Sequence, residues 1–393
     1  MLPPRVGCRV AIVSTFPPAE CGIGNYTQDL VAALADRSKD TEVVVLAEYA
    51  PGSIDSPAVR RVWNRRTRWV ADLLAAVDIV RPDLVHVQHE ESHQGQGREM
   101  LRFVRELRAR GIAVVVTLHS VYAGLYGRRL HRRLADAGVV LIAHQRTAMA
   151  EVLEAQGVPG DQIATISLGT STMTLPPQAV ARAALGLPVD GTVVLFFGFI
   201  HPKKGLHIAV EAFERAAQGY AARLVIAGRV RNRWFGDSLY AAALRRRMRD
   251  GIANQRIIFR PGFVDPDDKA AYFAAADLLV MPYQQRYGSA SAVLHDAFAA
   301  RRAFICSRSN KFAEAVDVIA SEIPEAFPAS GDVDQWTHGL QRMLSSGLLR
   351  ARMSELTSQL ADSSSWSKSA DRHANLYRAT IARDVRPQTA VSI

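Results

Sequence analysis

Short apolar runs alternate with amphipathic stretches along almost the whole chain. The runs are rich in Val, Ile and Leu and nearly free of charge, which is typical of strands buried on both faces of a parallel sheet. We predict strands at residues 9–14, 42–46, 84–90, 113–119, 139–143, 163–169, 193–197, 223–227, 257–259, 278–281 and 304–307. The order of strand and helix predicts an α/β protein with parallel sheets and right-handed crossovers.

The stretches between the strands repeat apolar residues at helical spacing. We predict helices at residues 25–35, 63–80, 100–110, 128–137, 145–156, 238–248, 266–275, 333–346, 349–362 and 368–381, with two more opening at Gly205 and at Ser289. The helix at 63–80 is basic and carries Trp63 and Trp69. It has two interpretations: packing against the first sheet, which we favour, or lying on a membrane surface.

A polar, proline-containing passage at residues 170–190 interrupts the alternation, which restarts after it. We therefore predict two doubly wound domains with a cleft between them. Residues 1–172 form the first domain and residues 173–365 the second. Residues 366–393 form a C-terminal helix that packs back on the first domain.

The stretch from residue 193 to residue 205 is the strongest candidate for an anion site. A buried strand ends at Gly198, a short loop carries His201, Lys203 and Lys204, and Gly205 opens a helix. The first N–H groups of a helix lack partners and its dipole favours an anion, so this loop suits a phosphate. The alternative is an ordinary surface loop with two solvated lysines.

A glycine loop and two strand ends mark the ligand side of the first domain. Gly22 and Gly24 let the backbone approach a ligand closely, just before a helix that we expect Asn25 to cap. The neighbouring predicted strands end near Glu90 and His119. Ligands of such sheets bind beyond the carboxyl ends of the strands, so these residues should converge.

Composition narrows the class of protein. The 393 residues are 48% hydrophobic, and the three cysteines are too few and too scattered for a disulfide framework or a zinc site. We expect a cytoplasmic protein without a signal peptide, because the N-terminus lacks an apolar segment and no apolar run reaches the ~20 residues that cross a bilayer.

The net charge of +10 comes mainly from arginine and indicates an anionic partner. An anionic membrane and phosphorylated ligands both fit, the former as peripheral contact with the inner face of the membrane. The alternative is arginine usage spread over solvated helix faces. No motif with base-reading spacing is present, so we expect no nucleic-acid partner. Basic residues cluster at residues 60–68, 98–110, 128–133 and 245–249.

Taken together and in order, several motifs resemble those of a known family. They are Phe16-Pro-Pro-Ala-Glu-Cys-Gly-Ile-Gly, Val85-His-Val-Gln-His-Glu, Val116-Thr-Leu-His, Phe197-Gly-Phe-Ile-His-Pro-Lys-Lys-Gly, Leu224-Val-Ile-Ala-Gly, Ala276-Asp-Leu-Leu-Val-Met-Pro-Tyr, Ser291-Ala-Val-Leu-His-Asp-Ala and Ser365-Trp366. Each is weak alone, but the set covers nearly the whole chain. The chain resembles the GT-B glycosyltransferases of family four, which are retaining and use nucleotide-sugar donors.

The resemblance implies a role for each matching residue. Lys204 corresponds to the lysine that holds the donor diphosphate, and Asp296 to a glutamate that contacts the ribose. Ser291 and the following amides correspond to a helix start that faces the phosphates. The implied catalytic residues are His119, Lys204 and Glu90. The implied donor-binding residues are Gly22, Gly24, His201, Lys204, Arg229, Ser291, Val293, Leu294 and Asp296.

The implied chemistry needs no cofactor and no metal. The leaving group is a nucleoside diphosphate, so catalysis consists mainly of stabilising the charge on its oxygens while the acceptor hydroxyl is oriented. Lys204 and oriented amides supply this, and no Asp-x-Asp pair is placed to demand a metal. The implied partners are a nucleotide-sugar donor and an acceptor that is a glycan, a lipid-linked glycan or a small molecule.

Four positions depart from the family pattern, and one of them is Asp296, which is shorter than the family's glutamate. The first residue of the family's acidic pair falls on Gly288, and a usual glycine is replaced by Arg301. The arginine expected after the glycine of the lysine loop is Phe199, so a second cation has to come from His201, Arg229 or elsewhere. These departures leave a second hypothesis open: a non-catalytic nucleotide-sugar-binding or scaffold subunit on the same fold. An epimerase or a phosphorylase is a third option, less favoured because no pyridoxal-binding lysine context is present.

Overall fold

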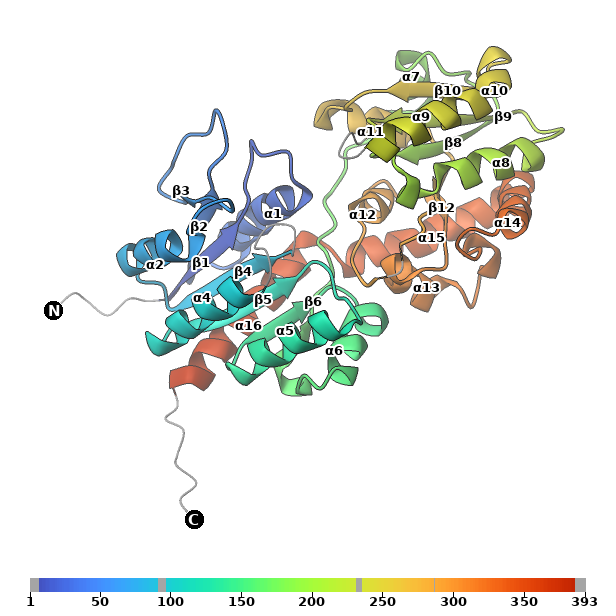
Figure 1. Ribbon diagram of the computed structural model, residues 1–393. Coiled ribbons are helices and arrows are strands. Elements are labelled where there is room, and N and C mark those ends of the chain that lie inside the picture. Colours follow the sequence, from blue (N-terminus) through green and yellow to red (C-terminus); the bar gives the residue numbers. More distant parts are fainter. Residues whose placement is uncertain (1–6, 91–96, 231–234, 286, 386–393) are drawn as a thin grey trace. The chain divides into compact units, whose positions relative to one another are not determined.

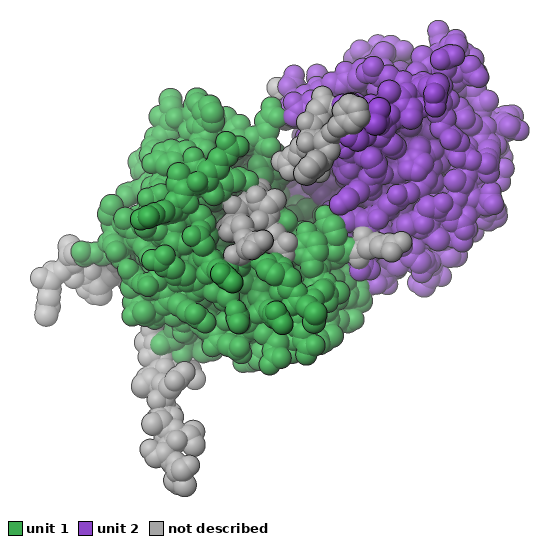
Figure 2. All heavy atoms as spheres, viewed as in Figure 1, with its two compact units in different colours: residues 1–169, 287–290, 364–393 green, residues 170–286, 291–363 purple. Residues whose placement is uncertain are grey.

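The computed structural model describes residues 7–90, 97–230, 235–285 and 287–385 (Figure 1). The chain divides into two compact units, coloured separately in Figure 2. Unit 1 comprises residues 1–169, 287–290 and 364–393, and unit 2 comprises residues 170–286 and 291–363. Each unit contains one fully parallel sheet with helices on both faces, as the alternation of strands and helices predicts.

Unit 1 is a seven-stranded sheet in the order β3-β2-β1-β4-β5-β6-β7. Helices α2, α4 and α5 cover one face, and α1 and α16 cover the other (Figure 1). The elements are β1 Cys8–Ser14, α1 Gly22–Arg37, β2 Thr41–Glu48, β3 Val59–Trp63, α2 Trp69–Val80, β4 Leu84–His89, α4 Arg98–Ala109, β5 Ala113–Leu118, α5 Leu125–Asp136, β6 Val140–Ala143, η1 Arg146–Ala150, α6 Glu151–Ala155, η2 Gly160–Gln162, β7 Ile163–Thr165 and α16 Trp366–Val385.

Unit 2 is a five-stranded sheet in the order β10-β9-β8-β11-β12. Its elements are α7 Gln178–Ala184, β8 Thr192–Phe197, η3 Pro202–Lys204, α8 Leu206–Ala216, β9 Ala222–Gly228, α9 Phe235–Arg247, α10 Arg249–Ala253, β10 Ile257–Pro261, α11 Pro266–Ala275, β11 Leu278–Met281, α12 Ala292–Ala299, β12 Ala303–Cys306, η4 Asn310–Phe312, α13 Ala313–Ile319, η5 Pro324–Ala326, α14 Val333–Ser345 and α15 Gly347–Ser363.

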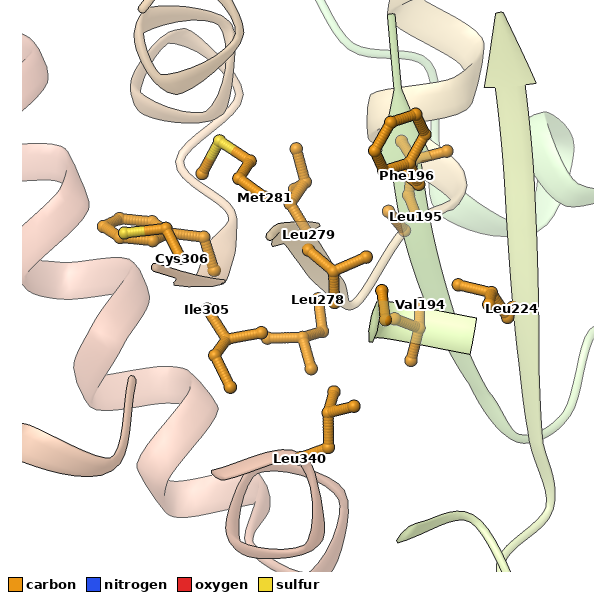
Figure 3. Close-up of a cluster of buried hydrophobic side chains, with 14 of the residues drawn as sticks. Val194, Leu195, Phe196, Leu224, Leu278, Leu279, Met281, Ile305, Cys306 and Leu340 are labelled. Atoms are coloured by element: carbon orange, nitrogen blue, oxygen red, sulfur yellow. The ribbon is translucent and has the colours of Figure 1, made fainter. Parts of the chain in front are cut away.

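The core of unit 2 shows why its central strands read as continuous apolar runs. Val194 and Leu195 of β8 lie between Leu224 of β9 and Leu278 of β11 (Figure 3). All four side chains are buried. Because helices cover both faces of the sheet, the central positions of these strands are withdrawn from water, and each buried side chain contributes roughly 1.5–3 kcal/mol.

The helix predicted at residues 63–80 is wrong at its start. Trp63 ends strand β3, its indole N–H donating to the carbonyl of Leu46 at 3.0 Å, and α2 begins only at Trp69. Both tryptophans are buried, and Trp69 packs on Phe103 with ring centres 5.8 Å apart. The pattern misled because a short edge strand and a helix lie end to end. These tryptophans are core residues, and the membrane-surface interpretation of this segment is incorrect.

Several other predicted boundaries move. Helix α1 begins at Gly22 with Cys21 in the cap position, so Asn25 lies inside the first turn and is not the cap. The strand predicted at 163–169 ends at Thr165, and the helix expected from Ser289 begins at Ala292. The passage at 170–190 contains helix α7, and the predicted helix at 145–156 is divided into the π-helix η1 and the short α6.

The C-terminal helix α16 belongs to unit 1, where Ala370, Ala374 and Tyr377 join a core cluster with β1 and β5. The Tyr377 hydroxyl lies 2.8 Å from Nδ1 of His86 on β4. The units divide at 169/170 and 363/364, a few residues from the predicted boundaries at 172/173 and 365/366. None of the described helices is long and apolar enough to span a membrane.

Candidate functional site

In unit 2 the carboxyl ends of the neighbouring strands β8, β9 and β11 lie at one edge of the sheet. Glycines follow two of these strand ends: Gly198 has φ +114°, and a Cβ added at Gly228 would lie 1.8 Å from the carbonyl oxygen of Gly198. No larger residue fits at Gly228. The backbone after β8 and β9 is therefore held in close contact at the edge where a ligand of this fold binds.

The lysine loop is fixed by the segment that follows β11. Gly205 is left-handed with φ +63°, and a Cβ there would lie 1.9 Å from the carbonyl oxygen of Pro282. The Gln284 N–H donates to the Lys203 carbonyl at 2.9 Å. The Lys204 ammonium lies over the ring of Tyr283, 3.4 Å from its centre. Tyr283 is buried, so it supports this ammonium from the protein side.

Helix α12 starts beside the same strand ends. Val293 Cγ2 lies 3.6 Å from the position that a Cβ on Gly198 would take. Ser291 caps the helix: its Oγ accepts from the Leu294 N–H at 3.4 Å, and its carbonyl accepts from the same N–H at 3.0 Å. The Leu294 amide is thus engaged within the cap. Of the two predicted donor-binding residues Val293 and Leu294, Val293 is therefore the one whose backbone amide we expect to face the phosphates.

Asp296, one turn into α12, is paired with Lys269 of α11. Lys269 Nζ lies 2.6 Å from Asp296 Oδ1, and the Asp296 side chain is only 21% exposed. Burial raises the pKa of Asp296, and Lys269 opposes that rise. Burial and the Asp296 charge also raise the pKa of Tyr283, while the Ser291 hydroxyl lowers it. Tyr283 therefore contacts Lys204 directly and lies within the electrostatic reach of Asp296.

Arg229 and His201 complete the predicted residues of unit 2. Arg229 follows β9, and its guanidinium carbon lies 5.6 Å from the ring centre of Phe199 and 5.7 Å from that of Phe263. A cation thus lies beside the position where the family's arginine is replaced by Phe199. His201 precedes η3, and its carbonyl accepts from the Lys204 N–H at 2.9 Å.

In unit 1 the structure brings the predicted residues to the ends of the adjacent strands β1, β4 and β5. Gly22 and Gly24 lie in the first turn of α1, where a Cβ on Gly24 would be 3.3 Å from the backbone nitrogen of Phe16. Glu90 accepts a hydrogen bond from the Ser120 hydroxyl at 2.8 Å. The His119 N–H donates to the His89 carbonyl at 3.1 Å. Glu91, which competes with Glu90 in the sequence, lies outside the described residues.

The His119 ring is held on several sides. Its Nε2 lies 2.9 Å from Gln88 Oε1, its Nδ1 lies 3.4 Å from His144 Nε2, and Tyr26 meets it edge-on with ring centres 5.1 Å apart. Because both ring nitrogens have protein partners, the ring is oriented before any ligand binds. Sequence reasoning missed Gln88, although its position in Val-Gln-His on a buried strand was a visible signal.

A buried polar chain supports Gln88 from below. Gln88 Nε2 lies 3.1 Å from His86 Nε2, which is also 2.7 Å from the Thr117 hydroxyl. His86 is fully buried, and burial places its pKa well below the usual value. This chain is therefore neutral near pH 7, in contrast to the charged cluster of unit 2. Among the described residues, no group of His, Cys, Asp and Glu is placed to hold a metal ion.

Two sequence profiles match the chain. The profile described as Glycosyltransferase Family 4 matches residues 21–173, and the one described as Glycosyl transferases group 1 matches residues 191–346. The chain belongs to the family-4 glycosyltransferases and has the GT-B fold. The fold class that the sequence predicts is thereby confirmed.

Curated relatives of this family-4 glycosyltransferase are named D-inositol 3-phosphate glycosyltransferase. The protein of Acidothermus cellulolyticus is 32% identical over 173 residues, which are 40% of this chain and 36% of that protein. The protein of Saccharomonospora viridis is 28% identical over 233 residues, which are 56% of this chain and 51% of that protein. The chain thus spans between about a third and a half of the length of these relatives.

Solved structures show the same fold at low identity. Sucrose-phosphate synthase from Thermosynechococcus elongatus has a TM-score of 0.75 at 19% identity, with 96% of this chain and 100% of that chain covered. Anabaena HepE in complex with UDP has a TM-score of 0.73 at 14% identity, with 94% and 100% covered. At these identities the likeness supports the fold alone.

The structure gives a physical reason for one departure of this glycosyltransferase from its family and shows the cost of another. A Cβ on Gly288 would lie 2.0 Å from the carbonyl oxygen of Ala148, so the segment 287–290 has no room for a carboxylate at that position. Arg301, which ends the turn after α12, has φ +51°. Glycine is favoured in this left-handed conformation, so the arginine is strained there.

Proposed function

We propose that the protein transfers a sugar from a nucleoside-diphosphate donor to an acceptor hydroxyl, with retention of configuration and without a metal. The observation that carries this is the cluster at one edge of the unit 2 sheet, where the Lys204 ammonium on Tyr283, the Ser291 cap of α12 and the Asp296–Lys269 pair come together. This edge is where doubly wound sheets bind nucleotides.

In this proposal the residues of the cluster bind different parts of the nucleotide-sugar donor. Lys204 and the amide of Val293 bind the diphosphate and stabilise its charge as the glycosidic bond breaks. Arg229 is the second cation, in place of the arginine that Phe199 replaces. Asp296 retains Oδ2 for a ribose hydroxyl while Lys269 holds Oδ1. A β-phosphate oxygen takes the acceptor proton on the face from which it departs, so no side-chain base is required.

Unit 1 binds the acceptor and the transferred sugar in this proposal. Glu90 and His119 lie at adjacent strand ends, and Gln88 and His144 fix the His119 ring. Because both ring nitrogens are engaged by the protein, His119 contributes a fixed ring surface to the acceptor side and is not needed as a proton acceptor. The relatives' names make a phosphorylated cyclitol one acceptor to test, beside lipid-linked and oligosaccharide acceptors. The proposed compartment is the cytoplasm.

A donor panel tests the proposal directly. The protein is incubated with UDP-, GDP- and dTDP-sugars and candidate acceptors, and nucleotide release is measured with and without EDTA. We expect release with at least one donor, unchanged by EDTA, and an α-linked product from an α-linked donor. Absence of turnover together with absence of nucleotide binding would reject the proposal.

A second candidate is a non-catalytic subunit that binds nucleotide sugars. Gly288 favours it, because the backbone there excludes the carboxylate that the family uses at this position. In that case nucleoside diphosphates bind to the protein, but no acceptor extract, including lipid and oligosaccharide fractions, supports transfer.

A further inference from the structure

Helices α4 and α5 lie side by side on one face of the unit 1 sheet (Figure 1). Each buries an apolar stripe in the core and turns a second face to solvent, and that second face is rich in arginine. The exposed arginines are Arg98, Arg102 and Arg105 on α4 and Arg128, Arg129, Arg132 and Arg133 on α5. We refer to these seven residues as the arginine face.

The charge of the arginine face is not neutralised locally. None of its seven members forms an ion pair with a carboxylate among the described residues. Neighbouring arginines do: Arg108 pairs with Asp384, and Arg110 pairs with Asp78 and Glu106. The acidic residues on the exposed surface of the two helices are Glu99, Asp136 and Glu106, and Glu106 is paired with Arg110. The face thus carries a strong net positive charge.

Two further features accompany the charge. Leu125, at the start of α5, is 73% exposed, and Tyr126 beside it is 46% exposed. Leu125, Arg129 and Arg132 follow each other at helical spacing along one exposed stripe. A hollow of ≈ 250 Å³ between the helices is lined by Arg105, Arg108, Arg133, Asp136 and Ala137.

We propose that the arginine face, with Leu125, is a docking surface for an anionic lipid bilayer. Arginine side chains near such a surface each contribute about 1 kcal/mol, and an exposed leucine on the same stripe adds apolar burial at the headgroup level. A polyanion such as nucleic acid would bind the arginines but would not bury the exposed leucine. The surface lies on the unit that we assign to the acceptor, so it would bring a membrane-bound acceptor to the enzyme.

Vesicle co-sedimentation of the full-length protein tests this without any turnover, so its outcome is independent of the proposed function. The probes are vesicles of phosphatidylcholine alone and of phosphatidylcholine mixed with phosphatidylglycerol. We expect sedimentation only with the mixed vesicles, weakened by salt. An R129Q/R132Q variant should partition roughly thirty-fold less. Failure of the wild-type protein to sediment would overturn the proposal.

A matched control separates the arginine face from the overall charge. Arg246 and Arg249 of unit 2 are also exposed, and R246Q/R249Q changes the net charge by the same amount. This variant should sediment within about two-fold of the wild type, and its thermal melting, like that of R129Q/R132Q, should be unchanged. Equal loss in both double variants would contradict a specific surface.

The Leu125→Ser variant distinguishes binding to an anionic membrane from binding to a polyanion such as DNA. It should reduce vesicle partition by roughly three-fold while leaving binding to duplex DNA unchanged, because burial of a leucine side chain is worth about 1.5–3 kcal/mol when complete and less when partial. If Leu125→Ser partitions to vesicles as well as the wild type does, and if DNA binding depends on Arg129 and Arg132, the partner of the arginine face is a polyanion such as DNA. That result would overturn the proposal.

Discussion

Unit 1 and unit 2 share a doubly wound plan but place different chemistry at the ends of their strands. In unit 2 the strand ends carry charges: the Lys204 ammonium over Tyr283, the Lys269–Asp296 pair and Arg229. In unit 1 the corresponding edge carries Glu90, which accepts from Ser120, and His119, which is held by Gln88 and His144. The cationic edge of unit 2 suits a diphosphate, and the hydrogen-bonding edge of unit 1 suits hydroxyl groups.

The contrast continues beneath the strand ends. His86 and His373 of unit 1 are fully buried, and burial places the pKa of His86 well below its usual value and lowers the pKa of His373 to about 4. In unit 2 the strand residues drawn in Figure 3 are apolar. Unit 1 thus holds two histidines whose pKa burial lowers, whereas burial in unit 2 raises the pKa of Asp296, so the two units should respond differently to acid.

Removal of the Lys204 charge is the largest effect that we expect. Lys204→Met should reduce sugar transfer by about 10²–10³-fold, because the lysine stabilises charge that develops on the leaving diphosphate. Lys203→Met is the matched control, since Lys203 is the exposed neighbour in the same turn. The measurement is kcat/KM with a saturating acceptor. Equal effects of the two substitutions would contradict the assignment.

Acid should destabilise unit 1 before unit 2. The unfolded chain binds a proton at each buried histidine below about pH 6.5, whereas folded His373 binds one only near pH 4. Stability therefore falls as the pH is lowered from 6.5 to 4, and His373 alone accounts for roughly 3 kcal/mol over that range. His86 adds to the loss in the same direction.

Hydrogen exchange at pH 7 and pH 5 follows the acid effect in each unit separately. Peptides from β4, β5 and α16 should exchange faster at the lower pH, after correction for the intrinsic rate, while peptides from β8 and β11 change less. A His373→Gln variant should show a smaller difference between the two pH values. If peptides of unit 2 lost protection from hydrogen exchange at a higher pH than peptides of unit 1, the proposed difference in acid stability between the units would be wrong.

Loss of the ring beneath Lys204 should have a smaller effect on the charged edge. Tyr283→Leu should weaken nucleoside-diphosphate binding by about five-fold to ten-fold, because it removes the aromatic face under the ammonium. Tyr283→Phe keeps that face and should bind within about two-fold of the wild type. Isothermal titration measures both. Similar losses in both variants would assign the role to the hydroxyl instead of the ring.

The smallest effect concerns the strained turn after α12. Arg301→Gly should raise the free energy of unfolding by about 1 kcal/mol, because glycine adopts the left-handed conformation without the Cβ penalty. The Arg301 side chain is 64% exposed and its contact with Asp362 spans 3.8 Å, so little is lost with it. Urea denaturation measures the change, and a decrease in stability would refute the strain.

Much of the architecture is predictable from the sequence because strands buried on both faces read as apolar runs. The runs around Val194 and Val115 gave strands at the correct places. The segment around Trp63 did not, because β3 is a short edge strand and the following turn and helix continue its apolar spacing. Local spacing cannot distinguish an edge strand followed by a helix from one helix.

The candidate site is most predictable where a residue lies shortly after a strand. Glu90 and His119 directly follow β4 and β5, and Lys204 lies in η3, within the loop that follows β8. Lys269 lies in α11 and its partner Asp296 in α12, and His144, although it directly follows β6, is paired with His119 far away in the sequence. Such pairings depend on tertiary packing, so no spacing along the chain reveals them.

Hydrogen exchange with and without a nucleoside diphosphate tests most directly whether unit 2 supplies the charged diphosphate site. With UDP or GDP at saturation, we predict protection of residues 198–205, 282–285 and 291–296. Protection confined to peptides of unit 1, or confined to unit 2 peptides far from these strand ends, would contradict the account.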